Sequence, residues 1–197
     1  MTDNKKFLEL PDPKDSTIQF YDEVCVESVA TAIACINDYE DLIAEWERTA
    51  APVLKELGFS LHREEKPITL QLTTYGGSVY DGMAFYDTVK GRNVNCVASG
   101  YVMSAGIFIM LGCKHRAAYR NTTFMIHSVA SAYEGKVDEV QRMLEQDKRL
   151  NDIIDKIILK ETKITEAQLA NMHKNLNDWF LTAEEALELG LIHEIVE

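Results

Sequence analysis

The chain has 197 residues, of which 46% are hydrophobic and 26% are charged, as is typical of a folded soluble protein, and we expect residues 1–197 to form one domain. Its formal net charge of −12 argues against the nucleic-acid-binding classes, because a phosphate backbone requires a basic protein surface. The longest dense apolar run, residues 105–111, is too short to cross a bilayer, so we expect no membrane partner.

Residues 1–66 are predicted to form an arm, one strand and a helical region. Residues 1–15 are polar and indicate a short irregular arm, and a strand follows at residues 17–21. From Glu23 onward, apolar residues recur at the spacing of a helix. Residues 40–66 are strongly charged and include helix breakers, so we expect a charged insert of one or two exposed helices that ends in a loop.

The rest of the chain alternates β-forming runs with helical patterns, which predicts an α/β fold. The expected strands are residues 68–73, 94–98, 116–119, 124–127 and 191–196. The expected helices begin at Val79, Ser104, Lys136 and Thr182 and end near Gly91, Gly112, Glu161 and Gly190. Turns are expected at Gly76-Gly77-Ser78 and at Ser99-Gly100.

The four cysteines lie far apart in the sequence and include no C-x-x-C pair. Three of them stand in apolar runs, which is typical of small buried side chains in a reducing compartment and not of disulfides or metal ligands. We therefore expect a cytoplasmic protein without a metal or a cofactor.

Two features of the α/β segment could place charge-stabilising groups. The glycines of Gly76-Gly77-Ser78 let the backbone turn its amide N–H groups outward, as an oxyanion site requires, although a plain strand–helix turn would use the same residues. Ser104 opens an apolar helix, where the helix dipole stabilises a developing negative charge. An N-cap serine would occupy the same position, and the residues alone do not decide between the two interpretations.

His127 is the one histidine that ends a hydrophobic strand, while the other four lie in charged or loop-like surroundings. A lone histidine there is more often a core residue than a catalyst, but the neighbouring strand–helix unit offers Ser104 as a partner. The third member of such a group must be an acid, and the chain has 32 acidic residues. Asp178 is the candidate, because the two aromatic residues that follow it indicate partial burial.

In this order the motifs resemble those of the Clp protease proteolytic subunit family. They are Gly76-Gly77-Ser78, the nucleophile motif Gly100-Tyr-Val-Met-Ser104-Ala-Gly106, the strand end Met125-Ile-His127 and the closing stretch from Asp178 to Ile192. The resemblance covers residues 68–196. It implies the spiral α/β fold of strand–strand–helix units that Clp proteases share with crotonases, with residues 128–161 forming a protruding handle around the long helix.

The resemblance also implies a role for each site residue. Ser104 would be the nucleophile of a serine endopeptidase, His127 its general base and Asp178 the acid that orients His127. The backbone amides of Gly77 and Ala105 would form the oxyanion hole. The residues expected to bind an extended peptide substrate by β-type pairing are Gly76, Ser78, Val79, Ser128, Val129, Ala130 and Ser131.

Members of this family assemble into stacked rings, usually of seven subunits, that enclose the active sites. The resemblance therefore implies self-association, and unfolded polypeptide substrates delivered by a ring-shaped AAA+ unfoldase that consumes the ATP. Two positions differ from the family pattern: Tyr75 stands where a proline is usual, and Ser128-Val129 replaces a glutamine–proline pair. Both differences are expected to affect specificity.

Two other functions stay open at this stage. A crotonase-like coenzyme A thioester enzyme would share the fold but use no nucleophilic serine, and a coenzyme A binding assay would distinguish it. A non-catalytic subunit that assembles with an active paralogue would keep the fold without the activity. A signal-peptide peptidase of related fold would need a membrane anchor, which the sequence does not predict.

Overall fold

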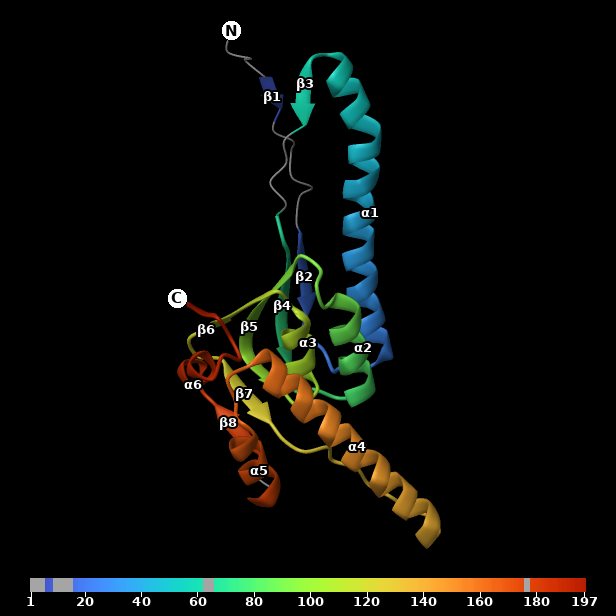
Figure 1. Ribbon diagram of the computed structural model, residues 1–197, viewed down its shortest axis with the longest axis vertical. Coiled ribbons are helices and arrows are strands. Elements are labelled where there is room, and N and C mark those ends of the chain that lie inside the picture. The colour runs from blue at the N-terminus through green and yellow to red at the C-terminus, as the bar shows by residue number, and fades with distance from the viewer. Residues whose placement is uncertain (1–5, 9–15, 62–65, 176–177) are drawn as a thin grey trace.

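A mostly parallel sheet forms the centre of the protein in the computed structural model, which describes residues 6–8, 16–61, 66–175 and 178–197 (Figure 1). Five strands lie side by side, all in parallel, in the order β2 (Thr17–Phe20), β4 (Ile68–Thr74), β5 (Val94–Met103), β6 (His115–Tyr119) and β9 (Glu194–Val196). Two more strands branch from the end of β5: β7 (Thr123–Ile126) pairs with β5 in parallel, and β8 (Trp179–Leu181) pairs with β7 in antiparallel.

Helices pack around this sheet and confirm the predicted α/β class. They are α1 (Val26–Glu56), α2 (Val79–Val89), α3 (Gly106–Gly112), α4 (Val137–Glu161), α5 (Glu166–Asn175) and α6 (Ala183–Glu188). Every residue of α3 is buried, so this short apolar helix forms the centre of the core. In the part of the chain that the structure describes, no helix combines the length and the apolar character needed to cross a membrane.

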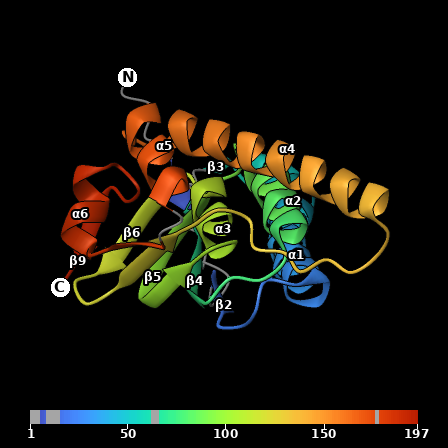
Figure 2. The same ribbon diagram turned by 90° about the horizontal axis from the view of Figure 1, so that it is seen from below.

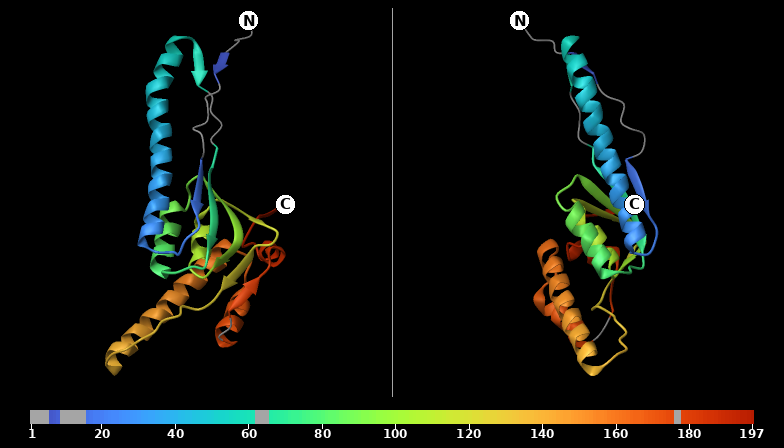
Figure 3. Two further views of the ribbon diagram at one scale, coloured as in Figure 1. Left: turned by 180° about the vertical axis from the view of Figure 1, so that it is seen from behind. Right: turned by 90° about the vertical axis from the view of Figure 1, so that its right-hand side faces the viewer.

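The first helix corrects the prediction for residues 40–66. α1 runs without interruption to Glu56 and passes through Pro52, whose position is exposed, so that water can satisfy the carbonyl that proline leaves unpaired. Beyond it, β3 (Phe59–Leu61) pairs in parallel with β1 (Lys6–Leu8). The expected irregular arm therefore contains a strand, while its residues 1–5 and 9–15 lie outside the described residues. Figures 1 and 3 show α1 extending far beyond the sheet, with β1 and β3 beside its distal half.

Two boundaries near the centre also differ from the prediction. The expected turn at Ser99-Gly100 is absent, because β5 continues through Gly100 to Met103. Gly100 takes a positive φ of 65° there, and the pairing of β5 with β4 shifts register at the same level, so glycine accommodates an irregularity within the strand. The helix expected from Ser104 begins only at Gly106. α5, β8 and the β1–β3 pair were not predicted.

The long helix α4 projects from the sheet as the handle, and the segment after β7 runs alongside it before the chain turns back (Figures 1 and 2). Its last residue, Glu161, is anchored to α2 by hydrogen bonds from Tyr86 and Lys90, at 2.7 and 2.5 Å. Arg116 donates to the Glu161 carbonyl and to the carbonyls of Gly190 and Leu191. The base of α4 is therefore fixed to α2, β6 and the C-terminal segment.

The hydrogen bonds at the base of α4 shift the pKa values of the groups that form them. Burial alone would raise the pKa of Glu161, but the hydrogen bonds from Lys90 and Tyr86 outweigh it and hold this pKa below its ordinary value of 4.5. Burial and the hydrogen bond to Glu161 raise the pKa of Tyr86 well above its ordinary value. Glu161 is therefore ionised and Tyr86 neutral throughout the physiological range of pH.

Candidate active site

The pairing of β5 with β7 brings the candidate nucleophile and base together. The two strands are parallel, with Met103 opposite Met125, so the residues that follow each strand lie at the same edge of the sheet. The Ser104 amide donates to the Met125 carbonyl at 2.9 Å and continues the ladder by one residue. Ser104 is thereby held beside the end of β7, where His127 follows.

Ser104 has an unusual backbone conformation. Its φ is 52°, which makes it the one non-glycine residue with a positive φ among the described residues. It lies in the turn between β5 and α3, two residues before the helix begins, and it does not cap that helix. A strained strand-to-helix turn of this kind exposes a serine hydroxyl to a substrate, and strain of this sort gathers at functional sites.

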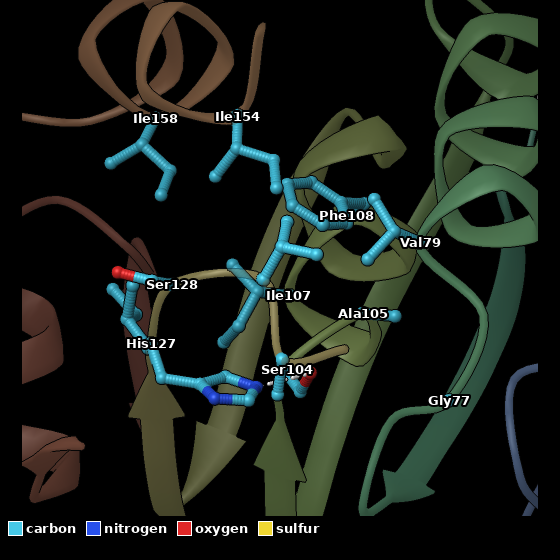
Figure 4. Close-up of a pocket in the computed structure, with 13 residues that line it drawn as sticks. Gly77, Val79, Ser104, Ala105, Ile107, Phe108, His127, Ser128, Ile154 and Ile158 are labelled. Atoms are coloured by element: carbon cyan, nitrogen blue, oxygen red, sulfur yellow. Dashed lines mark hydrogen bonds between the residues drawn. The ribbon is translucent and has the colours of Figure 1, made fainter. Parts of the chain in front are cut away.

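The serine and the histidine meet at hydrogen-bond distance. Oγ of Ser104 lies 2.7 Å from Nε2 of His127, and the imidazole ring points toward the hydroxyl (Figure 4). Nε2 must be unprotonated to accept this proton, so the neutral ring carries its proton on Nδ1. This is the arrangement that a general base requires when it activates a serine.

Asp178 lies on the Nδ1 side of the same ring. β8 runs antiparallel to β7 with Trp179 opposite Ile126, so the next pair in register is Asp178 and His127. The nearest carboxylate oxygen is 3.8 Å from Nδ1, beyond the usual range of a hydrogen bond. The Asp178 side chain is 57% exposed, so the partial burial expected from its aromatic neighbours is wrong for this chain by itself.

The glycine turn lies directly against Ser104. Gly76 and Gly77 have φ values of 100° and 146°, which favour glycine strongly. A Cβ on Gly76 would come within 2.7 Å of the Ser104 Cβ, and one on Gly77 would clash with the Val24 carbonyl oxygen. Neither the Gly77 amide nor the Ala105 amide has an assigned acceptor within the described residues. Two unpaired N–H groups therefore flank the serine.

An apolar cavity of about 160 Å³ opens beside the serine (Figure 4). Its lining includes the expected residues Gly77, Val79, Ser104, Ala105, His127, Ser128, Val129 and Ala130. The wall is completed by five apolar residues that were not predicted to belong to a site: Ile107, Phe108, Ile126, Ile154 and Ile158. Ile154 and Ile158 belong to the apolar face of α4, whose helical spacing in the sequence was a signal for burial and not for a cavity.

The other expected substrate residues have structural contacts of their own. Ser78 accepts from the Asp81 amide as the N-cap of α2, and its own amide donates to Val24. Gly76 accepts from the Val24 amide and is buried, while Ser131 is exposed and does not line the cavity. Among the described residues, no group of three or more His, Cys, Asp or Glu side chains is arranged to hold a metal ion.

His173, which was predicted to lie in charged or loop-like surroundings, is found beside the candidate site. It lies on α5, where Leu169 and Met172 are buried, and it contacts both Ser128 and Asp155. The helical spacing of its apolar neighbours was the available signal for its placement. Nothing local in the sequence indicated its two polar partners, which lie 45 and 18 residues away.

Comparisons with known proteins identify the family and the fold. The family model named Clp protease matches residues 43–197. The ATP-dependent Clp protease proteolytic subunit of Deinococcus radiodurans is 30% identical over 137 residues, which span 68% of this chain and 66% of that relative, just under two thirds of its length. A point mutant of ClpP1 from Listeria monocytogenes shares the fold, with a TM-score of 0.72, 24% identity, and coverage of 92% of this chain and 91% of the other.

Proposed function

The chain belongs to the Clp protease family, and from that premise we propose that it is a serine endopeptidase with Ser104 as its nucleophile. One observation carries the proposal: the Ser104 hydroxyl, in a strained turn between two unpaired amides, lies 2.7 Å from Nε2 of His127. This combination of nucleophile, base and oxyanion donors is what acyl transfer to a serine needs.

The reaction is hydrolysis of a peptide bond through an acyl-enzyme. Ser104 attacks the carbonyl carbon while His127 takes its proton, and the Gly77 and Ala105 amides stabilise the oxyanion. His127 then gives the proton to the leaving amine, and the acyl-enzyme remains. A water molecule, deprotonated by His127, attacks the ester carbon. The bond from that carbon to the Ser104 oxygen breaks, the acyl group leaves as a carboxylic acid, and the proton returns from His127 to Ser104. Asp178 keeps the His127 proton on Nδ1 and stabilises the imidazolium.

The cavity indicates the class of side chain that precedes the cleaved bond. Its wall is formed largely by Val79, Ile107, Phe108, Ile154 and Ile158. A cavity of about 150 Å³ with such a lining can hold a group of the size of benzene, and this one measures about 160 Å³. We expect preference for an apolar residue such as leucine, methionine or phenylalanine at that position, and rejection of charged residues, whose desolvation would not be compensated.

The natural substrates are proposed to be unfolded polypeptides, and their cleavage is proposed to occur inside stacked rings of this subunit. Sedimentation of the purified protein tests whether such rings form. A ring-shaped AAA+ unfoldase is the proposed partner that delivers them. The cytoplasm is the proposed location, and the free state of all four cysteines, two of them buried, supports a reducing compartment. The crotonase-like and non-catalytic alternatives are not favoured, since neither function needs a serine that is hydrogen-bonded to a histidine.

The test is covalent labelling of the purified protein with a fluorophosphonate probe, followed by peptide mapping. Modification confined to Ser104, together with cleavage of an unfolded polypeptide, is the expected result. Ser104→Ala should abolish both and leave the oligomeric state unchanged. Peptidase activity near the wild-type level in Ser104→Ala would refute the assignment.

A further inference from the structure

A second serine–histidine–aspartate cluster lies beside the first, and the proposed chemistry does not use it. Oγ of Ser128 lies 2.7 Å from Nδ1 of His173, and Nε2 of His173 lies 3.0 and 2.9 Å from the two carboxylate oxygens of Asp155. Ser128 directly follows His127, His173 belongs to α5 and Asp155 to α4. Three separate elements therefore meet in one polar chain.

The direction of each proton in this chain follows from the groups themselves. The carboxylate of Asp155 can only accept, so Nε2 of His173 carries a proton and donates it. In the neutral imidazole Nδ1 then accepts, and the Ser128 hydroxyl is the donor to it. The hydroxyl is thereby held away from Ser104 and the cavity, as Figure 4 shows. It is not placed to attack a peptide bound at Ser104.

The next residue of the same segment is held by α4 directly. Oδ1 of Asn151 accepts from the Val129 amide at 2.9 Å. Asn151 and Asp155 are four residues apart, so they lie one turn apart on the same face of α4. Two successive residues after His127 are therefore attached to two successive turns of the helix. The Val129 amide is occupied and is not free to pair with a substrate.

The attached segment forms one wall of the cavity, and the same helix forms another. Ser128, Val129 and Ala130 line the cavity together with Ile154 and Ile158 of α4. Asn151 and Asp155 thus set the separation between two walls, because they bind the segment to the helix that carries the isoleucines. A change in these polar contacts alters the width of the cavity without touching Ser104 or His127.

We propose that Asp155 and His173 are positioning residues that, with Asn151, hold residues 128–130 at the distance from α4 that an apolar substrate side chain requires. The proposal rests on the proposed peptidase function, because it gives this polar chain a role in substrate binding. Loss of the hydrogen bonds that join Ser128, His173 and Asp155 is expected to weaken substrate binding and to leave the acylation chemistry unchanged.

The first experiment needs no activity. His173→Phe keeps a ring of similar size but removes both hydrogen bonds. His115→Phe is the matched control, since the half-exposed His115 lies on β6, away from residues 128–130. Deuterium uptake of residues 128–134 should be about threefold to tenfold faster in His173→Phe. The segment loses its one hydrogen bond to His173, and the net free energy of one hydrogen bond corresponds to a change of this size. Uptake in β4 should be unchanged. Equal uptake by His173→Phe and the wild type at residues 128–134 would overturn the proposal.

The second experiment separates binding from chemistry. For a peptide with leucine before the cleaved bond, His173→Phe should raise KM about threefold to tenfold, while kcat and the rate of fluorophosphonate labelling stay within about twofold. Lower kcat and slower labelling with an unchanged KM would overturn the proposal, because His173 would then act on the catalytic residues. If wild-type Ser104 is not labelled, the peptidase proposal fails, while the exchange experiment still tests the attachment of residues 128–130.

A conservative variant distinguishes the hydroxyl from general packing. Ser128→Thr keeps the hydroxyl that donates to His173, so its KM should stay near the wild-type value. Ser128→Ala removes this donor and should raise KM as much as His173→Phe does. Asp152→Asn, a change at an exposed position of α4, should have no effect. Combining Ser128→Ala with Asp155→Ala should add little to either single change, because both act through His173. Full additivity would show that the three residues do not act as one chain.

Discussion

Ser104 and Ser128 each belong to a serine–histidine–aspartate cluster, and the more complete of the two sets of hydrogen bonds is not the one proposed to be catalytic. In the Ser128 cluster both contacts are short, 2.7 Å to the serine and 2.9 Å to the nearer carboxylate oxygen. In the Ser104 cluster the serine contact is equally short, but Asp178 stands 3.8 Å from the imidazole.

The difference lies in what surrounds each serine. Ser104 has a positive φ, two unpaired amides beside it and an apolar cavity in front of it, whereas the Ser128 hydroxyl points away from that cavity. A catalytic serine needs an oxyanion site and room for a substrate, and these come from backbone conformation and not from the three side chains. A complete hydrogen-bonded triad is therefore weaker evidence for catalysis than the strained turn.

The sharpest contrast is expected between the two histidines. His127→Ala should lower kcat by about three orders of magnitude, because it removes the group that takes the Ser104 proton. His173→Phe should change kcat by less than about twofold, because His173 is not in contact with the reacting atoms. Steady-state hydrolysis of a fluorogenic peptide measures both. Equal losses of kcat in the two variants would remove the distinction between the clusters.

The second contrast concerns the backbone beside Ser104. In Gly76→Ala the new Cβ would stand 2.7 Å from the Ser104 Cβ, so the turn must move, and kcat should fall roughly a hundredfold as an oxyanion donor is displaced. Gly91→Ala is the control, because Gly91 has a similar φ of 90° but open space around the added atom. It should cost about 1–2 kcal/mol of stability in a urea titration and leave kcat unchanged.

The third contrast tests the distance of 3.8 Å between Asp178 and Nδ1 of His127, which is too long for a hydrogen bond. Asp178→Asn should lower kcat by roughly tenfold to a hundredfold, less than the ~10⁴-fold loss found when a fully bonded triad aspartate is replaced. An exposed carboxylate 3.8 Å away orients the imidazole less strongly than a bonded one. Asp152→Asn serves as the matched control. A loss of kcat near 10⁴-fold would contradict this expectation. It would mean that Asp178 comes within hydrogen-bond distance of His127 in the active assembly.

The smallest effect is expected at the base of α4, the helix that carries Asp155. Glu161→Gln should lower the free energy of unfolding by about 1–3 kcal/mol at pH 7, since it weakens two charge-assisted hydrogen bonds. The pKa of Glu161 is held below 4.5 in the folded state, so its contribution is complete above that pH and is lost as the pH falls further. Urea titrations at pH 7 and pH 3.5 should therefore show a smaller difference from wild type at the lower pH. Glu188→Gln, at an exposed position, is the control.

Short windows of the sequence were enough to select Ser104 and His127 as candidates, because a serine at the start of an apolar run and a histidine at the end of a β-forming run are both local features. Asp178 was chosen among 32 acidic residues from its aromatic neighbours and then from the family resemblance. Its position depends on the register of β7 and β8, two strands far apart in the sequence. The contacts of His173 with Ser128 and Asp155 were not predictable, since they depend on how α4 and α5 pack.

The errors in the predicted fold have a similar origin. Charge and helix breakers predicted one or two exposed helices at residues 40–66, distinct from the helical pattern before them. Instead, one helix runs through to Glu56, because a helix that extends into solvent needs only a narrow buried face and tolerates both charge and Pro52. Val29, Ala32 and Ile36 supply that face near its beginning. The turn expected at Gly100 failed because a glycine with positive φ can also sit inside an irregular strand.

The antiparallel pairing of β8 with β7 has a consequence for how the proposed peptidase activity could be lost. A single residue inserted between Asp178 and Trp179 would shift the aspartate by one position while leaving β8 paired. Because side chains alternate between the faces of a strand, the carboxylate would then point to the opposite face from His127. An inactive paralogue could therefore keep every catalytic residue in its sequence, and counting triad residues would not reveal that it is silent.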